Sequence, residues 1–149
     1  MKVLIASDHA GLEGKRRAVA IADELGFEVE DLGPSDESSV DYPDFAHRVA
    51  AAVERGEARF GVLVCGTGLG MSMAANRHPG VRAAVITDEL TAEMARAHND
   101  ANIACFGERV LGADRIGELL RTFLTRQFDD GRHLRRVEKI ECPRGLQGS

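Results

Sequence analysis

The sequence predicts a single Rossmann-like α/β domain, in which a five-stranded parallel sheet lies between two layers of helices. Short apolar runs alternate with amphipathic helical segments along residues 1–128, and no linker or internal repeat interrupts them. This alternation is typical of parallel sheets with helical crossovers. The composition, 44% hydrophobic and 29% charged, is that of an ordinary globular domain.

Five apolar runs are predicted to be strands. The second alternates apolar with acidic residues, which indicates a strand near the sheet edge. The third, ending at Val64, is entirely apolar apart from one glycine and is therefore expected to be buried on both faces. The predicted strands are residues 2–7, 27–32, 60–64, 81–87 and 103–106.

Five helices are predicted between and after these strands. Gly26 stands where a C-terminal cap belongs, and Pro43 fits a first helical turn. Asp41 and Asp88 are expected N-caps. The predicted helices are residues 12–25, 43–54, 71–77, 90–97 and 113–128. We expect one domain over residues 1–141, with a charged tail from residue 129, and disorder over residues 142–149.

Charge and composition exclude several classes of function. The formal charge of −5 gives no basic footprint for nucleic acid, and no apolar run is long enough to span a membrane. Met1-Lys2-Val3 leads straight into the first predicted strand, so we expect no signal peptide. The three cysteines, Cys65, Cys105 and Cys142, show no disulfide or metal spacing, so we expect a cytoplasmic protein with free thiols.

A glycine-rich loop, residues 66–70, follows the third strand and Cys65. Its glycines allow close backbone approach, and the following helix start would direct N–H groups at a ligand and favour a thiolate at Cys65. A buried structural thiol is the alternative. The loop fails the dinucleotide-binding pattern because its third glycine comes one residue early; only Asp88, about twenty residues on, favours a nucleotide.

Other polar residues fall at the predicted strand tips. Asp8 and His9 follow the first strand, and Arg109 follows the fifth. Ligands of parallel α/β sheets bind at this edge. His98 leaves the fourth helix and is less easily placed. Simpler interpretations remain open: a helix cap for Asp8, surface positions for His9, His47 and His78, a helix C-terminus for His98, core packing for Cys105, and a solvated charged face for residues 132–136.

Taken together, these segments resemble the ribose-5-phosphate isomerase B family, whose relatives include galactose-6-phosphate and allose-6-phosphate isomerases. The similarity runs from Met1 to about Glu141. The motifs that carry it are Ser7-Asp-His-Ala-Gly11, Asp41-Tyr-Pro43, Cys65-Gly-Thr-Gly-Leu-Gly-Met-Ser72, Ala75-Asn76, Arg96-Ala-His-Asn-Asp-Ala-Asn102, Phe106-Gly-Glu-Arg109 and Gly131-Arg-His-Leu-Arg-Arg-Val-Glu138.

The resemblance implies an aldose–ketose isomerase that moves a proton between C1 and C2 of a phosphosugar through an enediolate, without cofactor or metal. The substrate would be ribose 5-phosphate or ribulose 5-phosphate. Cys65 would be the base, His98 would open the sugar ring, and the phosphate would bind to His9 and three arginines. The implied catalytic residues are Cys65, Thr67, His98 and Asp8. The implied binding residues are His9, Tyr42, Gly66, Gly68, Gly70, Ser72, Asn99, Arg109, Arg132 and Arg136.

The resemblance also implies a homodimer, sometimes paired further into a tetramer, with active sites shared between subunits and with the last helix and tail in the interface. Two alternatives stay open. One is isomerisation of another phosphosugar, such as a hexose 6-phosphate or tetrose 4-phosphate. The other is a non-catalytic module that binds a phosphosugar or a nucleotide.

Overall fold

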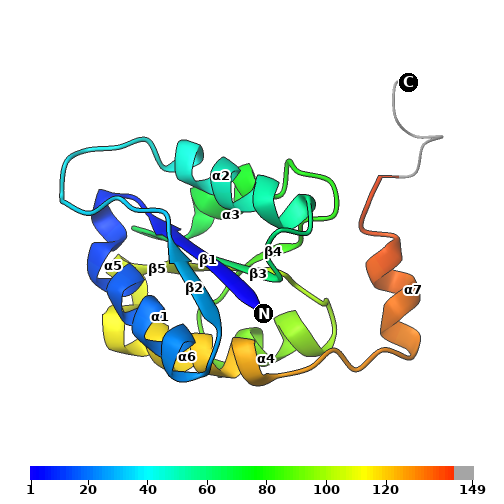
Figure 1. The fold of residues 1–149 in the computed structure, drawn as a ribbon. Helices are drawn as coiled ribbons and strands as arrows, with labels where there is room; N and C mark the ends of the chain where they lie inside the picture. The colour runs from blue at the N-terminus through cyan, green and yellow to red at the C-terminus, as the bar shows by residue number, and fades with distance from the viewer. Residues whose placement is uncertain (143–149) are drawn as a thin grey trace.

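Five parallel strands form the centre of the computed structural model, which describes residues 1–142 (Figure 1). This confirms the predicted sheet. The second strand lies at one edge, as its alternating pattern indicates, and the strand order is β2-β1-β3-β5-β4. The strands are β1 (Lys2–Ser7), β2 (Glu28–Asp31), β3 (Phe60–Cys65), β4 (Ala83–Val85) and β5 (Ile103–Gly107).

Helices cover both faces of the sheet, as predicted. On one face lie α1 (Leu12–Glu24), α4 (Glu89–Ala97) and α6 (Ala113–Thr125), and on the other lie α2 (Tyr42–Glu54) and α3 (Leu69–Ala75) (Figure 1). Successive side chains of a strand point to opposite faces. Val3 and Ile5 of β1 therefore pack in the α1/α6 core, whereas Leu4 and Ala6 pack in the α2/α3 core.

The strand register brings the carboxyl ends of β1, β3 and β5 to one level. Ser7 lies opposite Val64, and Cys65 lies opposite Gly107. At the opposite ends of the strands, where β3 and β5 begin, the Gly61 N–H donates to the Asn102 carbonyl. The molecule therefore has a carboxyl edge beside Cys65 and an amino edge beside residues 98–102.

Several predicted boundaries were wrong by a few residues. Helix α3 begins at Leu69, before the expected Met71, because Gly68 adopts a left-handed conformation (φ +83°) that turns the chain directly into the helix. Strand β4 is shorter than residues 81–87 at both ends. The predicted helix 113–128 ends at Thr125, where Arg126 becomes extended. Asp41 occupies the N-cap position of α2, but its side chain makes no capping hydrogen bond.

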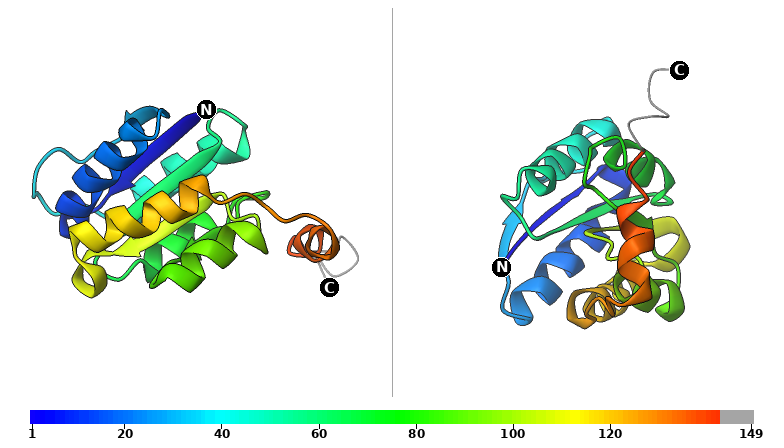
Figure 2. Two further views of the ribbon diagram at one scale, coloured as in Figure 1. Left: turned by 90° about the horizontal axis from the view of Figure 1, so that it is seen from below. Right: turned by 90° about the vertical axis from the view of Figure 1, so that its right-hand side faces the viewer.

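Short helices were also missed. A 3-10 turn, η1, spans His9–Gly11, and α5 spans Glu108–Leu111. The tail contains a further helix, α7 (Arg132–Glu138), which stands apart from the two helical layers (Figure 2). Residues 143–149, most of the expected disordered tail, lie outside the described residues. Within residues 1–142, no helix is long and apolar enough to cross a membrane.

A buried arginine holds the amino edge together. Arg96 of α4 is 3% exposed, and its Nη1 donates to the Asp100 carboxylate at 2.8 Å and to the Ala101 carbonyl at 2.7 Å. Its guanidinium carbon lies 4.9 Å from the centre of the Phe60 ring. These contacts fix the segment that follows α4, which carries His98 and Asn99.

Arg96→Ala should therefore destabilise the fold by about 3 kcal/mol, because it removes packing and leaves a partly buried carboxylate with fewer partners. Urea denaturation measures this change. Arg121→Ala is the matched control: Arg121 forms an exposed ion pair with Glu24 at 2.6 Å, so its loss should cost less than about 1 kcal/mol. Equal effects of the two substitutions would contradict the structural role of Arg96.

Candidate functional site

The Cys65 thiol lies at the tip of β3, under the glycine loop. The side chain is almost completely buried, and the backbone N–H of Gly68 donates to Sγ at 3.1 Å. An N–H donor at this distance stabilises negative charge on sulfur. The structure thus places the Cys65 thiol, the predicted base, beside a backbone N–H donor of the glycine loop.

Close backbone contacts hold the loop against β5. A Cβ atom at Gly107 would lie 2.6 Å from Cα of Thr67, and one at Gly68 would lie 3.1 Å from the carbonyl carbon of Phe106. The first of these distances is impossible for a real side chain, and the positive φ of Gly68 is strained for any other residue. Glycine is therefore required at both positions for the loop to adopt this conformation.

The loop leads directly into α3. The first intrahelical bond is from the Ser72 N–H to the Gly68 carbonyl, so the N–H groups of Gly70 and Met71 precede the helical ladder. Two predicted side chains bond within this turn. Thr67 Oγ1 accepts from the Leu69 N–H at 3.3 Å, and the Ser72 hydroxyl donates to the Leu69 carbonyl at 2.7 Å. Both hydroxyls support the shape of the loop.

Asp8 and His9 lie at the same edge, directly after β1. The Asp8 N–H donates to the Val64 carbonyl, and the Asp8 carboxylate accepts from the Ala10 N–H at 2.9 Å. Asp8 is thus a cap, as the simpler interpretation held, and also a neighbour of the Cys65 strand tip. His9 Nδ1 accepts from the Val40 N–H at 3.2 Å, so a neutral His9 ring carries its proton on Nε2.

Tyr42 and Arg109 complete this cluster. The Tyr42 ring covers Gly70 so closely that a Cβ there would lie 2.7 Å from the tyrosine oxygen. The Arg109 N–H donates to the Gly66 carbonyl at 3.1 Å, and its guanidinium lies against Gly66. Within residues 1–142, Arg109 has no carboxylate partner in an ion pair. An exposed, unpaired guanidinium is suited to bind an anion.

A second cluster of predicted residues lies at the amino edge of the sheet. His98 caps the C-terminal end of α4, and Asp100, two residues later, lies 3.8 Å from Arg59, which precedes β3. Asn99 is exposed there. The His98 ring stacks on His133 with ring centres 4.0 Å apart. Loss of hydration and the neighbouring His98 and Arg132 lower the pKa of the His133 imidazole.

Arg132 and Arg136 belong to α7, beside this second cluster. Both are exposed, and neither has a carboxylate partner among the described residues. Strand β3 is six residues long, so it separates the two edges of the sheet by roughly 15–20 Å. One chain therefore does not bring His98, Asn99, Arg132 and Arg136 to Cys65.

Two neighbours of the predicted residues were overlooked in the sequence. The Glu108 carboxylate accepts from the Gly14 N–H in the first turn of α1, which ties the Arg109 segment to the start of α1, close to His9. His133 was quoted within a motif but given no role. The signal that could have found Glu108 and His133 is that they directly adjoin Arg109 and Arg132 in the sequence. The contact between Glu108 and Gly14 joins residues 94 positions apart, so no local pattern predicts it.

Asp88, the residue that favoured nucleotide binding, has a local structural role. The Asp88 carboxylate accepts from the Thr91 N–H at 2.8 Å, and the Thr91 hydroxyl accepts from the Asp88 N–H at 3.1 Å. The bond from the Thr91 N–H lowers the pKa of the Asp88 carboxyl, and the two bonds together form a capping box at the start of α4. The carboxylate is thus engaged as a helix cap.

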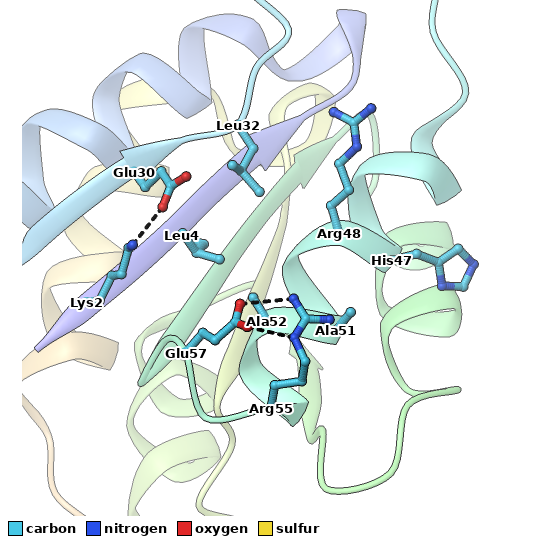
Figure 3. Close-up of a pocket in the computed structure, with 10 residues that line it drawn as sticks. All are labelled: Lys2, Leu4, Glu30, Leu32, His47, Arg48, Ala51, Ala52, Arg55 and Glu57. Atoms are coloured by element: carbon cyan, nitrogen blue, oxygen red, sulfur yellow. Dashed lines mark hydrogen bonds and ion pairs between the residues drawn. The ribbon is translucent and has the colours of Figure 1, made fainter.

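A hollow of about 540 Å³ elsewhere on the surface contains none of the predicted site residues (Figure 3). Leu4, Leu32 and Ala52 line it. Of the cations that line it, Lys2 and Arg55 are paired with Glu30 and Glu57, both at 2.8 Å, and Arg48 lies 5.3 Å from the centre of the Phe45 ring. Polar groups do not converge on a common point here, so Cys65 and its loop remain the stronger candidate site.

Comparison with known proteins agrees with the pattern of motifs. Residues 3–140 match the family model described as Ribose/Galactose Isomerase. Ribose-5-phosphate isomerase B of Escherichia coli is 42% identical over 93% of each chain.

Two solved structures are similar along nearly the whole chain. That of Clostridium thermocellum ribose-5-phosphate isomerase B has a TM-score of 0.90 and 50% identity, and the alignment covers 94% of this chain and 95% of the other. That of the Mycoplasma genitalium enzyme with bound ribulose-5-phosphate has a TM-score of 0.89 and 41% identity over 93% of each chain. The chain therefore belongs to the ribose/galactose isomerase family, and its close relatives include type B ribose-5-phosphate isomerases.

Proposed function

We propose that this protein is an aldose–ketose isomerase that interconverts ribose 5-phosphate and ribulose 5-phosphate. The observation that carries the proposal is the Cys65 thiol at a strand tip, which accepts from the Gly68 N–H of a glycine loop whose next N–H groups, those of Gly70 and Met71, precede the helical ladder of α3. The similarity to the Mycoplasma genitalium enzyme, whose structure contains ribulose-5-phosphate, supports this choice of substrate.

In the proposed reaction, Cys65 removes the proton from C2 of the open-chain aldose. The electrons of the broken C–H bond form a C1–C2 double bond, and negative charge develops on O1. Backbone N–H groups of the loop, including that of Gly70, stabilise this charge. The proton then returns to C1 while the O2 proton passes to O1, which gives the ketose. Thr67 and Ser72 keep the loop in the required shape, and no cofactor is needed.

The remaining residues bind the substrate and open its ring. His98 would transfer the proton that opens the furanose ring, because a histidine exchanges protons near neutral pH. Asp8 would hydrogen-bond the sugar hydroxyls near the anomeric carbon. Fixing the distal phosphate of a flexible open-chain sugar lowers the entropic part of the barrier. The residues proposed to bind phosphate are His9, Arg109, Arg132 and Arg136, and those proposed to bind sugar hydroxyls are Tyr42 and Asn99.

These assignments require two chains, because the separation across the sheet prevents one chain from assembling them. We propose a homodimer, which can pair further into a tetramer, in which α7 and the end of α4 of one subunit complete the Cys65 site of the other. Exposed apolar side chains support this arrangement. Leu69 and Met73 of α3 are 52% and 61% exposed beside the loop, and Leu134 of α7 is 45% exposed. Burying such residues favours association.

The free thiol at Cys65 is compatible with a reducing compartment, so a cytoplasmic location is part of the proposal.

A turnover assay tests the substrate. Purified protein without added metal should isomerise ribose 5-phosphate with a higher kcat/KM than galactose 6-phosphate, allose 6-phosphate or erythrose 4-phosphate. A preference for one of the latter three would leave the reaction type intact and replace the substrate. Binding without turnover of any of them would favour the non-catalytic alternative.

Cys65→Ala should lower kcat by about 10²–10⁴-fold while substrate still binds, because the base acts in the transition state. Steady-state kinetics and calorimetric titration of substrate separate the two effects. Cys105→Ala is the matched control. Burial raises the pKa of the Cys105 thiol, whose side chain lies in the core, so this variant should keep its kcat. A Cys65→Ala enzyme with undiminished kcat would exclude Cys65 as the base.

Mixed dimers test the shared site. Cys65→Ala and Arg136→Ala should each lower kcat/KM strongly as homodimers. Refolded together in equal amounts, they should recover about a quarter of wild-type activity, because half of the dimers are mixed and each mixed dimer has one intact site. Sites confined to single subunits would give no recovery, and sedimentation would independently report whether dimers form.

A further inference from the structure

Two histidines and one aspartate, residue types that commonly bind metal ions, meet at the amino edge of the sheet. They come from the end of α4 (His98), the segment between α6 and α7 (Asp129), and the first turn of α7 (His133). The His98 Nε2 atom lies 3.9 Å from Asp129 Oδ2, and the two imidazole rings stack 4.0 Å apart. One ligand atom from each residue lies within 4.8 Å of the other two.

The carboxylate in this group is held in position by its neighbours. The Asp129 N–H donates to the carbonyl of Ala97, the residue before His98, at 2.9 Å. Arg126 Nη2 lies 3.2 Å from Asp129 Oδ1, which leaves Oδ2 as the oxygen nearer to His98. A carboxylate oriented by a second hydrogen-bonding partner is a common feature of metal ligands in proteins.

The chemistry of these donors selects a particular class of ion. Two imidazoles and one carboxylate suit Zn²⁺ and related late first-row divalent ions better than Mg²⁺ or Ca²⁺, which prefer all-oxygen sites. We propose that His98, Asp129 and His133 form a binding site for Zn²⁺ or a related ion, with a fourth position left to water. Bound there, the ion would inhibit the proposed isomerase and would not serve as its cofactor.

Binding requires a small rearrangement. The planes of the two rings are only 13° from parallel, whereas a shared ion lies in the plane of each ring that binds it. Both rings must therefore turn out of the stack, so that their nitrogens reach about 2.0–2.1 Å from the ion. His98 and His133 are half-buried at the surface. Their movement is the structural change that accompanies binding.

Inhibition follows from the identity of one ligand. If His98 opens the sugar ring, a metal ion on its imidazole occupies the lone pair that would accept a proton. This consequence rests on the proposed isomerase function, whereas the binding site itself does not.

Calorimetric titration of the metal-free, full-length protein with ZnCl₂ tests the site. We expect one ion per chain in the wild type. In His133→Gln and in Asp129→Asn, the affinity for Zn²⁺ should fall at least about tenfold. The control is His78→Gln. His78 Nε2 lies 2.8 Å from His47 Nδ1, but its nearby carboxylate, Glu54, bonds to the other ring nitrogen and is not placed as a ligand. This variant should bind Zn²⁺ like the wild type.

Cobalt spectra identify the ligands independently. Co²⁺ bound to nitrogen and oxygen shows visible d–d bands without the sulfur charge-transfer band that Cys65 ligation would produce. Absence of binding, unchanged affinity in both site variants, or a sulfur band would each overturn the proposal. If the site is correct, Zn²⁺ should also inhibit ribose 5-phosphate turnover reversibly. A protein with no turnover would refute the proposed function, but the binding data would still decide whether the metal site exists.

Discussion

The close contact between the Cys65 loop and the end of β5 is the constraint on which the candidate site depends. Thr67 can lie on Gly107 only because no Cβ stands between them, and Gly68 can turn into α3 only because it tolerates a positive φ. The parallel register sets the tips of β1 and β5 level with Cys65. The thiol, the loop N–H groups and the Asp8 turn are thereby fixed relative to one another before any ligand binds.

The sheet also explains why one chain does not bring all of the proposed site residues together. A crossover helix that starts at the carboxyl edge returns its C-terminal end to the amino edge, so His98 must lie a full strand length from Cys65. Helix α7 begins near that amino edge, where the Asp129 N–H bonds to Ala97, and its far end is linked to residue 80 by the Glu141 carboxylate. The proposed homodimer follows from this geometry, because a second copy of the chain can bring its own amino edge to the Cys65 loop.

The arginines illustrate how burial and pairing distinguish charges that the fold already uses from charges that are free to bind an anion. Arg96 is buried, bonded to Asp100 and packed on aromatic rings, so its charge is already used by the fold. Arg109, Arg132 and Arg136 are exposed and have no carboxylate partner within the described residues. Guanidinium groups of this second kind can take up a phosphate without first breaking an ion pair.

The sequence alone determined the αβα class, the sheet edge that carries Cys65, and the position of the glycine loop beside it, because hydrophobic periodicity and glycine spacing are local properties. It did not place helix α7, the Glu108 cap on α1 or the stack of His98 on His133. Each of these depends on residues distant in sequence whose contact follows from packing. Tertiary structure alone decided that the predicted residues form two groups on opposite edges, because the direction of each crossover, and not the residue type, sets the edge at which a side chain emerges.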